Sequence, residues 1–273
     1  MPIERDITIG GCRLIQGDAR AVLPALDLQA DLCVTDPPYA LSSGGSRPGA
    51  MGGKFSSDVY DNSGLLMDVV GWHEIGGPIF RALKPDADCY VMSDDSNLFA
   101  AHGGFIGAGF KFHALLVWDK IVPNRTRYYM KDSEFTIYLW KGRAVDINNG
   151  GSKRVWRGHR PVDAVHNTQK PVALMQLYIE NSSLLGQLVL DPFMGSGSTL
   201  VAAVQTGRRA IGIEKSPKHF EAACARVWLT ACRSRKRYEA LPQSGRSYRR
   251  SEPHQGATVV PNPSLRNAAR MCG

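Results

Sequence analysis

Residues 31–39 read DLCVTDPPY, an apolar run that stops at two consecutive prolines. Proline cannot donate a backbone hydrogen bond to a sheet, and it pushes the residue before it toward extended backbone angles. Residues 31–35 are therefore predicted to form a short buried strand, with Asp36, Pro37, Pro38 and Tyr39 at its carboxyl end. A planar base stacked on Tyr39 could donate its amine hydrogens to Asp36 and to the carbonyl of Pro37. Asp-Pro-Pro-Tyr can also form an ordinary turn, so the rest of the chain must decide whether it is a functional motif.

A second apolar run ends in the same dipeptide. Residues 188–199 read LVLDPFMGSGST, and residues 199–206 are predicted to form a helix. Glycines let a loop approach a ligand closely, and the start of a helix directs backbone N–H groups toward it. The sequence therefore predicts a ligand-binding loop, comprising Asp191, Pro192, Phe193, Gly195, Ser196, Gly197, Ser198 and Thr199.

Together the two stretches resemble the S-adenosylmethionine-dependent DNA amino-methyltransferases, whose defining motifs are Asp/Asn/Ser-Pro-Pro-Tyr/Phe and Phe-x-Gly-x-Gly. The catalytic motif comes first, so the order resembles the β group of that family over about residues 10–230. The resemblance implies S-adenosylmethionine as cofactor, duplex DNA as substrate, and residues 36–39 as the catalytic motif. It favours N6 of adenine, because the members that act on N4 of cytosine more often carry Ser-Pro-Pro-Tyr.

Three further segments are expected to hold the cofactor, two by the resemblance and one by its spacing from the glycines. Asp18 and Ala19 follow a predicted strand at 12–16, where the carboxylate is expected to meet the adenine amine of the cofactor. Thr168 and Lys170 precede a predicted helix at 172–181, and the lysine is expected to bind the methionine carboxylate. Glu214 ends a predicted strand at 209–214 and Lys215 follows it, about twenty residues beyond the glycines, where a carboxylate can bind ribose hydroxyls.

Positive charge is concentrated in two segments of the 273-residue chain, whose net charge is +8. Residues 120–160 hold ten basic against three acidic residues, and residues 233–273 hold nine against two. Such segments are typical of a surface that contacts phosphates. We expect a target-recognition insert at about 120–165 and a basic, disordered tail at 233–273. The expected DNA-binding residues are Arg47 and Lys54 in a Gly/Ser-rich loop, Arg125 and Arg127 among aromatic residues, and Lys153, Arg154, Arg157 and Arg160.

Strands alternate with helices along residues 1–232, which predicts one α/β catalytic domain with a Rossmann-like, mostly parallel sheet covered on both faces. Further helices are expected at 19–26, 65–83 and 97–109, and a further strand at 89–93. Strands at 112–118 and 134–140 are expected to form an antiparallel hairpin at one edge. Both Asp-Pro loops should then meet at the carboxyl ends of adjacent central strands, where ligands of open α/β sheets bind.

Composition excludes several other classes of protein. No apolar run is long enough to span a bilayer and no signal peptide is evident, so a soluble, cytoplasmic protein of bacterial or phage type is expected. The six cysteines form no Cys-x-x-Cys pair and the seven histidines show no ligand spacing, so no metal is expected.

Alternative functions remain open from the sequence. The chain could methylate N4 of cytosine, methylate an RNA adenine, or bind the cofactor and DNA without turnover. A hydride-transfer enzyme is disfavoured, because Leu200 stands where Gly-x-Gly-x-x-Gly needs its last glycine. One small recognition insert offers little surface for recognising a specific DNA sequence, so we also expect a homodimer with two copies of the insert.

Overall fold

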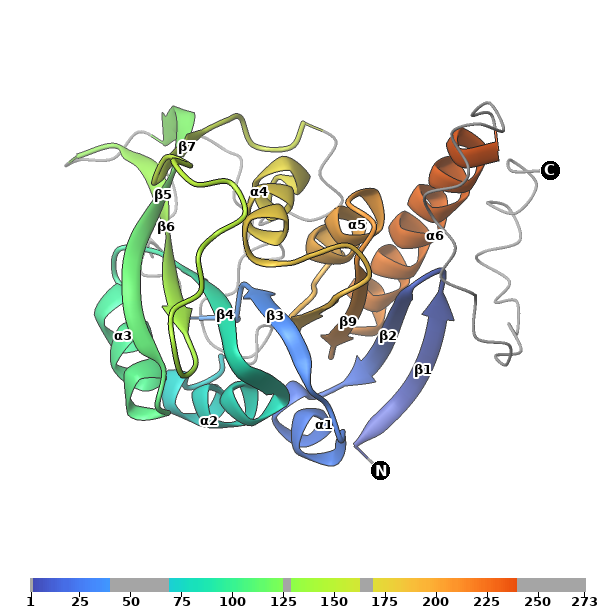
Figure 1. The fold of residues 1–273 in the computed structure, drawn as a ribbon, viewed down its shortest axis with the longest axis horizontal. Coiled ribbons are helices and arrows are strands. Elements are labelled where there is room, and N and C mark those ends of the chain that lie inside the picture. The colour runs from blue at the N-terminus through green and yellow to red at the C-terminus, as the bar shows by residue number, and fades with distance from the viewer. Residues whose placement is uncertain (1, 40–68, 125–128, 163–168, 240–273) are drawn as a thin grey trace, which may run out of the picture.

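The structure is a computed structural model that describes residues 2–39, 69–124, 129–162 and 169–239. A nine-stranded mixed sheet forms its centre, in the order β1-β2-β9-β8-β3-β4-β6-β5-β7 (Figure 1). The strands are β1 Ile3–Ile9, β2 Cys12–Gly17, β3 Ala30–Thr35, β4 Leu83–Ser93, β5 Lys111–Asn124, β6 Lys131–Trp140, β7 Val155–Arg157, β8 Leu188–Asp191 and β9 Arg209–Glu214. The central strands from β2 to β4 are parallel, which brings their carboxyl ends to one edge of the sheet.

Helices cover both faces of this sheet (Figure 1). Helices α1 Ala19–Ala25, α2 Trp72–Ala82 and α3 Leu98–Gly107 pack on one face. Helices α4 Val172–Ser182, α5 Ser198–Gln205 and α6 Pro217–Glu239 pack on the other. The predicted α/β architecture is thus confirmed.

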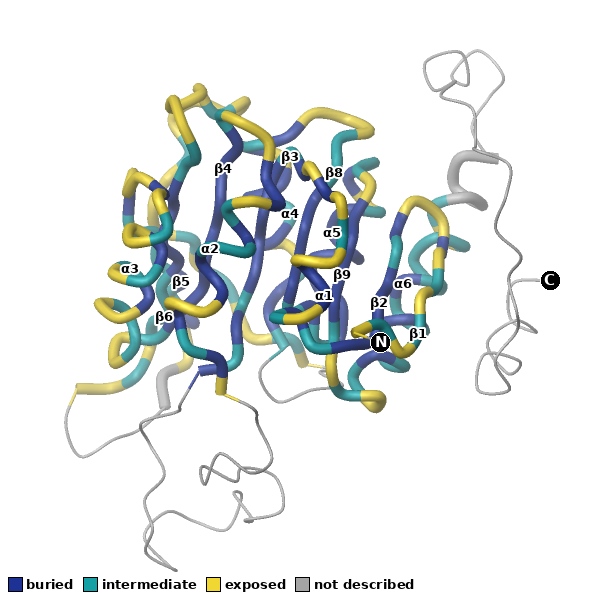
Figure 2. The backbone as a smooth tube through the Cα atoms, turned by 90° about the horizontal axis from the view of Figure 1, so that it is seen from below, coloured by how far each residue is buried: buried dark blue, intermediate teal, exposed yellow. Residues whose placement is uncertain are grey.

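The buried residues form two apolar layers, one on each side of the sheet, because successive strand residues point to opposite faces. In β3, Leu32 and Val34 join the layer under α4 and α5, whereas Cys33 joins the layer under α2. Figure 2 shows buried residues along the strands and exposed residues on the outer surfaces of the helices. The two layers hold the carboxyl ends of the strands in fixed positions.

Some predictions about the strands were wrong, both in their positions in the sheet and in their bounds. The hairpin of β5 and β6 is present but is not at the edge, because β7 pairs with β5 on its outer side. The other edge carries a second antiparallel pair, β1 with β2, which we did not predict. Strand β4 begins at Leu83, well before the predicted start at residue 89.

One helix differs from its predicted bounds, and another extends into the segment predicted as a disordered tail. Helix α2 begins only at Trp72, and residues 65–68 lie outside the described part of the chain. Helix α6 continues through Glu239, past residue 233, where the basic tail was predicted to begin. Residues 240–273 are outside the described ranges. No helix within the described residues is both long and apolar enough to cross a membrane.

Candidate active site

The two Asp-Pro loops meet at the carboxyl edge of the sheet. Strands β3 and β8 are parallel neighbours, with Cys33 opposite Leu190. The hydroxyl of Thr35, the last residue of β3, donates a hydrogen bond of 3.0 Å to Asp191 Oδ1, at the end of β8. Tyr39 and Phe193 contribute to the same apolar cluster. The structure therefore brings together the two loops that the sequence separates by more than 150 residues.

Asp36 lies within a network of charged side chains. Lys170 Nζ lies 2.5 Å from Asp36 Oδ2 and 3.3 Å from Glu134 Oε2. Glu134 Oε1 in turn lies 2.9 Å from Lys120 Nζ. Burial raises the pKa of Asp36, and Lys170 opposes that rise. The second carboxylate oxygen, Asp36 Oδ1, is buried and accepts no hydrogen bond from the described residues.

An unpaired buried acceptor is costly, so it indicates a position where a ligand donor completes the site. Because the other oxygen is bound by Lys170, Asp36 has one oxygen for the protein and one for a ligand. This arrangement fits the predicted acceptance of an amine hydrogen. The expected contact of Lys170 with the cofactor carboxylate stays a prediction, since the structure places this lysine against Asp36 and Glu134.

Tyr39 is buried, and its ring stacks on Trp72 at the start of α2, with 5.7 Å between ring centroids and 25° between planes. Burial raises the pKa of its phenol above the usual range, so the side chain stays neutral. The carbonyl of Pro38 accepts the N–H of Val70 at 3.1 Å. These contacts fix the chain just after Asp36.

The loop at the end of β8 is shaped by two glycines with left-handed backbone angles, Gly195 with φ of +50° and Gly197 with φ of +81°. A Cβ built on Gly195 would meet no described atom within 4 Å, so a ligand can approach the loop there. The carboxylate of Glu214 accepts the backbone N–H of Ser216 at 2.7 Å and those of Gly195 and Lys215. The predicted cofactor residues of β8 and β9 are thus linked directly.

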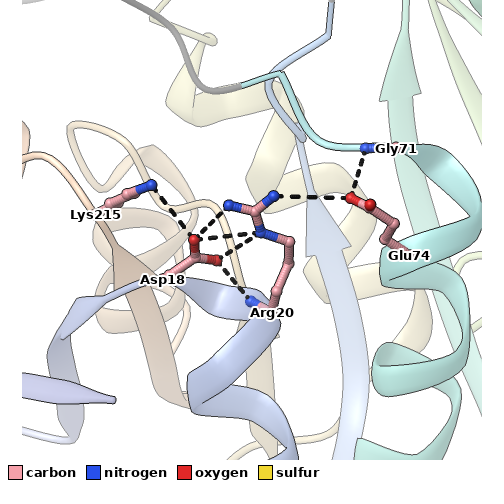
Figure 3. Close-up of polar contacts among 5 residues, drawn as sticks. All are labelled: Asp18, Arg20, Gly71, Glu74 and Lys215. Atoms are coloured by element: carbon pink, nitrogen blue, oxygen red, sulfur yellow. Dashed lines mark hydrogen bonds and ion pairs between the residues drawn. The ribbon is translucent and has the colours of Figure 1, made fainter. Parts of the chain in front are cut away.

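Asp18 caps helix α1 beside the end of β9, as the sequence suggests, and is held by two cations (Figure 3). Its carboxylate accepts from the backbone N–H and the guanidinium of Arg20, at 3.0 Å and 2.6 Å, and lies 3.4 Å from Lys215 Nζ. Arg20 lowers the pKa of Asp18 to about 2. The guanidinium also reaches Glu74 of α2 at 3.8 Å. Asp18 is therefore ionised and fixed at the same edge as Glu214.

Arg226, from the last helix, contributes to the site although we did not predict it. Its guanidinium donates to the carbonyl of Ser196 at 2.6 Å and to the hydroxyl of Ser196 at 2.9 Å. Burial lowers the pKa of Arg226. An arginine within an amphipathic helix usually points to solvent, so sequence pattern alone could not identify this role.

Glu134 and Lys120 were also missed as site residues. They lie on the neighbouring strands β6 and β5, and Lys120 is only 6% exposed. The sequence carried one signal, charged residues where the two apolar runs of the hairpin adjoin their connection, but this signal does not indicate the partner of either charge.

The predicted DNA-binding residues are only partly within the described chain. Lys153, Arg154, Arg157 and Arg160 are all exposed, and Arg157 forms an ion pair of 3.1 Å with Asp119. Arg47, Lys54, Arg125 and Arg127 lie outside the described residues, as does Thr168. No cluster of metal-binding side chains occurs among the residues that were described.

Comparison with known proteins places this site in a family. The N6/N4 methyltransferase model, described as DNA methylase, matches residues 30–225. Type II methyltransferase M2.DpnII of Streptococcus pneumoniae is 31% identical over 222 residues, which cover 72% of this chain and 82% of the relative.

Solved structures agree on the fold. The complex of M1.HpyAVI with SAM has a TM-score of 0.61 at 23% identity and covers 79% of this chain and 99% of its own. The cytosine-N4-specific PvuII DNA methyltransferase has a TM-score of 0.65 at 16% identity. The match covers 82% of this chain and 89% of the PvuII enzyme. The chain belongs to the N6/N4 family of S-adenosylmethionine-dependent DNA methyltransferases.

Proposed function

We propose that this DNA methyltransferase moves the methyl group of S-adenosylmethionine to N6 of an adenine in duplex DNA. The observation that carries the proposal is the buried Asp36 Oδ1, which has no hydrogen-bond partner among the described residues. The preceding residue, Thr35, is hydrogen-bonded to Asp191, from which the glycine loop begins. The Asp-Pro-Pro-Tyr form of the motif supports adenine as the target. Family membership supports DNA methylation as such, and the choice of base is our own inference.

The amine of adenine is a poor nucleophile because its lone pair is delocalised into the ring. In the proposed reaction, Asp36 Oδ1 and the Pro37 carbonyl accept the two amine hydrogens and concentrate the lone pair on nitrogen. S-adenosylmethionine supplies an electrophilic methyl group on a sulfonium. As the nitrogen bonds to the methyl carbon, the carbon–sulfur electron pair would stay on sulfur. The extra proton on nitrogen would then pass to the Asp36 carboxylate, whose pKa is raised by burial. Holding the two reactants in the correct orientation can lower the activation barrier by about 7 to 11 kcal/mol.

A base inside a duplex cannot reach this buried carboxylate, so the target must leave the stack. Flipping costs about a few kcal/mol, which stacking on an aromatic side chain can offset. The ring of Tyr39 stacks on Trp72, and Tyr39 belongs to the same tetrapeptide as Asp36, so we assign the stacking role to Tyr39. The exposed residues Lys153, Arg154, Arg157 and Arg160 would contact phosphates or bases.

The residues present fit the cofactor. The open position over Gly195 and the N–H groups at the start of α5 offer a cradle for its methionine part, with Ser196 and Ser198 in the same loop. Lys170 is proposed as a further contact of the methionine part. Glu214 is proposed to bind the ribose hydroxyls, and Asp18 to bind the adenine amine. The remaining proposed cofactor contacts are Ala19, Thr168, Asp191, Pro192, Phe193, Gly197, Thr199 and Lys215.

The base assignment is tested by incubating duplex DNA with the protein and labelled S-adenosylmethionine, followed by mass spectrometry of the nucleosides. We expect N6-methyladenine. Recovery of N4-methylcytosine alone would overturn the choice of adenine. Duplex RNA of matching sequence serves as competitor, and preferential labelling of RNA would overturn the choice of DNA.

We also propose a homodimer that reads a near-palindromic site, because the recognition insert of one chain is small. Sedimentation of the protein alone and bound to DNA should give the mass of two chains in at least one state. A monomer in both would contradict this proposal.

A further inference from the structure

The network around Asp36 holds two carboxylates and two ammonium groups in alternation. Lys120 contacts Glu134, Glu134 contacts Lys170, and Lys170 contacts Asp36. The side chains of Lys120 and Lys170 are 6% and 10% exposed, so their charges have little access to water. Buried ammonium groups are retained when a carboxylate compensates each of them. The sum of charges in this network is zero.

Lys170 alone, without Glu134, would pair with Asp36 only. A carboxylate that is fully paired with an ammonium group is a weaker acceptor for a further hydrogen bond, because the cation withdraws its electron density. In the structure, Lys170 Nζ lies between Asp36 Oδ2 and Glu134 Oε2. Glu134 Oε2 has no aligned hydrogen bond within the described residues, so its effect on Lys170 is mainly that of its charge.

We propose that Glu134 is a positioning residue of the methyl-transfer site: it shares the ammonium of Lys170 with Asp36 and so keeps Asp36 Oδ1 a strong acceptor for the target amine. Lys120 holds Glu134 in this position from the neighbouring strand. This inference rests on the proposed role of Asp36. It assigns a function to three charged residues that lie on β5, on β6 and before α4, all distant in sequence from the catalytic motif.

The direction of the electrostatic effect distinguishes this role from a structural one. Among the charged groups that act on Asp36, Lys170 lowers its pKa, whereas Glu134 and Asp94 raise it. Tyr39 and Asp191 also lie within electrostatic range of Asp36. Loss of the Glu134 charge should therefore lower the pKa of Asp36. Because Asp36 acts as the ionised form, the acid limb of the rate profile should move to lower pH even as the maximal rate falls.

The test compares single-turnover methyl transfer to DNA across pH for the wild type, Glu134→Gln and Glu134→Asp. Glu134→Gln keeps the shape of the side chain and should lower the maximal rate about tenfold, with the acid limb displaced to lower pH. Glu134→Asp restores the charge and should recover part of the rate and the position of the limb. Glu221→Gln is the matched control, because Glu221 pairs with Arg5 on α6 and β1, away from Asp36. It should change neither quantity.

A kinetic cycle provides the sharper criterion. In an Asp36→Asn background the acceptor carries no charge, so Glu134→Gln should have no further effect on the rate. A tenfold loss of rate on Glu134→Gln in both the wild-type and the Asp36→Asn protein would overturn the role of Glu134. So would a Glu134→Gln variant with the wild-type rate and the wild-type acid limb. If Glu134→Gln does not fold, the pair Lys120→Met with Glu134→Gln removes both charges together and should show the same loss and the same shift.

The outcome also separates this inference from the proposed function. If Asp36→Ala transfers methyl groups at the wild-type rate, the proposed function of Asp36 fails, and the inference fails with it. If Asp36→Ala is inactive and Glu134→Gln behaves as the wild type, only the inference fails. Calorimetric titration of each variant with S-adenosylmethionine verifies that the compared proteins are loaded.

Discussion

Asp36 and Asp191 occupy equivalent places in the fold but have opposite environments. Asp36 directly follows β3 and Asp191 is the last residue of β8; each precedes a proline, and the two strands are parallel neighbours. Asp191 is 4% exposed, and its carboxyl accepts from Thr35, from the N–H of Phe193 at 3.1 Å and from Thr199. Asp36 is bound on one oxygen by Lys170, and its other oxygen has no hydrogen-bond partner within the described residues.

The difference shows how one dipeptide can serve two purposes. Asp191 is satisfied by uncharged donors, so it joins the ends of two strands and supports the glycine loop. Asp36 is paired with a cation and retains an acceptor for a ligand. The predicted contact of Asp191 with the cofactor stays a prediction, and the structure gives its side chain a linking role in addition.

The largest expected effect comes from removing the acceptor. Asp36→Ala should lower the single-turnover rate of methyl transfer about 100- to 1,000-fold, the range found when one preorganised charge-stabilising group is removed. The affinity for S-adenosylmethionine, measured by calorimetry, should change little. A variant that loses cofactor binding in proportion to its rate would indicate that Asp36 serves the cofactor and not the base.

The second prediction concerns the pH dependence of stability. Burial raises the pKa of Asp191 to about 7, above the value of about 3.9 that the unfolded chain would show. The native state therefore binds the proton more tightly, and this stabilisation is complete below about pH 4 and is lost as the pH rises through about 7. Asp191→Asn is neutral at every pH, so its free energy of unfolding should rise relative to the wild type over that range.

The size of this effect has an upper limit of about 4 kcal/mol, since each pKa unit corresponds to about 1.4 kcal/mol. Chemical denaturation at several pH values measures it. A difference between Asp191→Asn and wild type that is independent of pH would contradict the linking role assigned to a buried, protonatable Asp191.

The smallest effect is expected in the loop that Asp191 supports. Arg226→Met removes the donor to the carbonyl and hydroxyl of Ser196 and should weaken S-adenosylmethionine binding about tenfold, since hydrogen bonds from charged groups contribute about 1.5 to 3 kcal/mol. Arg143→Met is the matched control, because its ion pair with Asp86 is at the surface. Equal affinities of the two variants would show that the loop keeps its shape without Arg226.

Local patterns predicted much of the fold. Apolar runs with flanking prolines or glycines identified the central strands, and the order of strands and helices implied a parallel sheet with both Asp-Pro loops at one edge. The sequence did not reveal β1, because Arg5 shares a face with Ile3, Ile7 and Ile9 and interrupts the apolar alternation. Nor did it reveal that β7 covers the hairpin, because three residues are too few for a periodic signal.

The site was harder to predict where it depends on pairing between distant segments. The motif identifies Asp36, but its partner Lys170 is separated from it by more than 130 residues, and the sequence predicts only a cofactor contact for this lysine. Lys120 and Glu134 become neighbours only through the register of β5 and β6. Such contacts depend on tertiary geometry, about which local propensity and residue spacing carry no information.

The most direct test of the central claim is a crystal structure of the protein with duplex DNA and a cofactor analogue that cannot donate a methyl group. We predict a flipped adenine stacked on Tyr39, with N6 about 2.7–3.2 Å from Asp36 Oδ1 and from the carbonyl of Pro37. A target base whose amine lies away from Asp36, with Oδ1 still unpaired, would contradict the account.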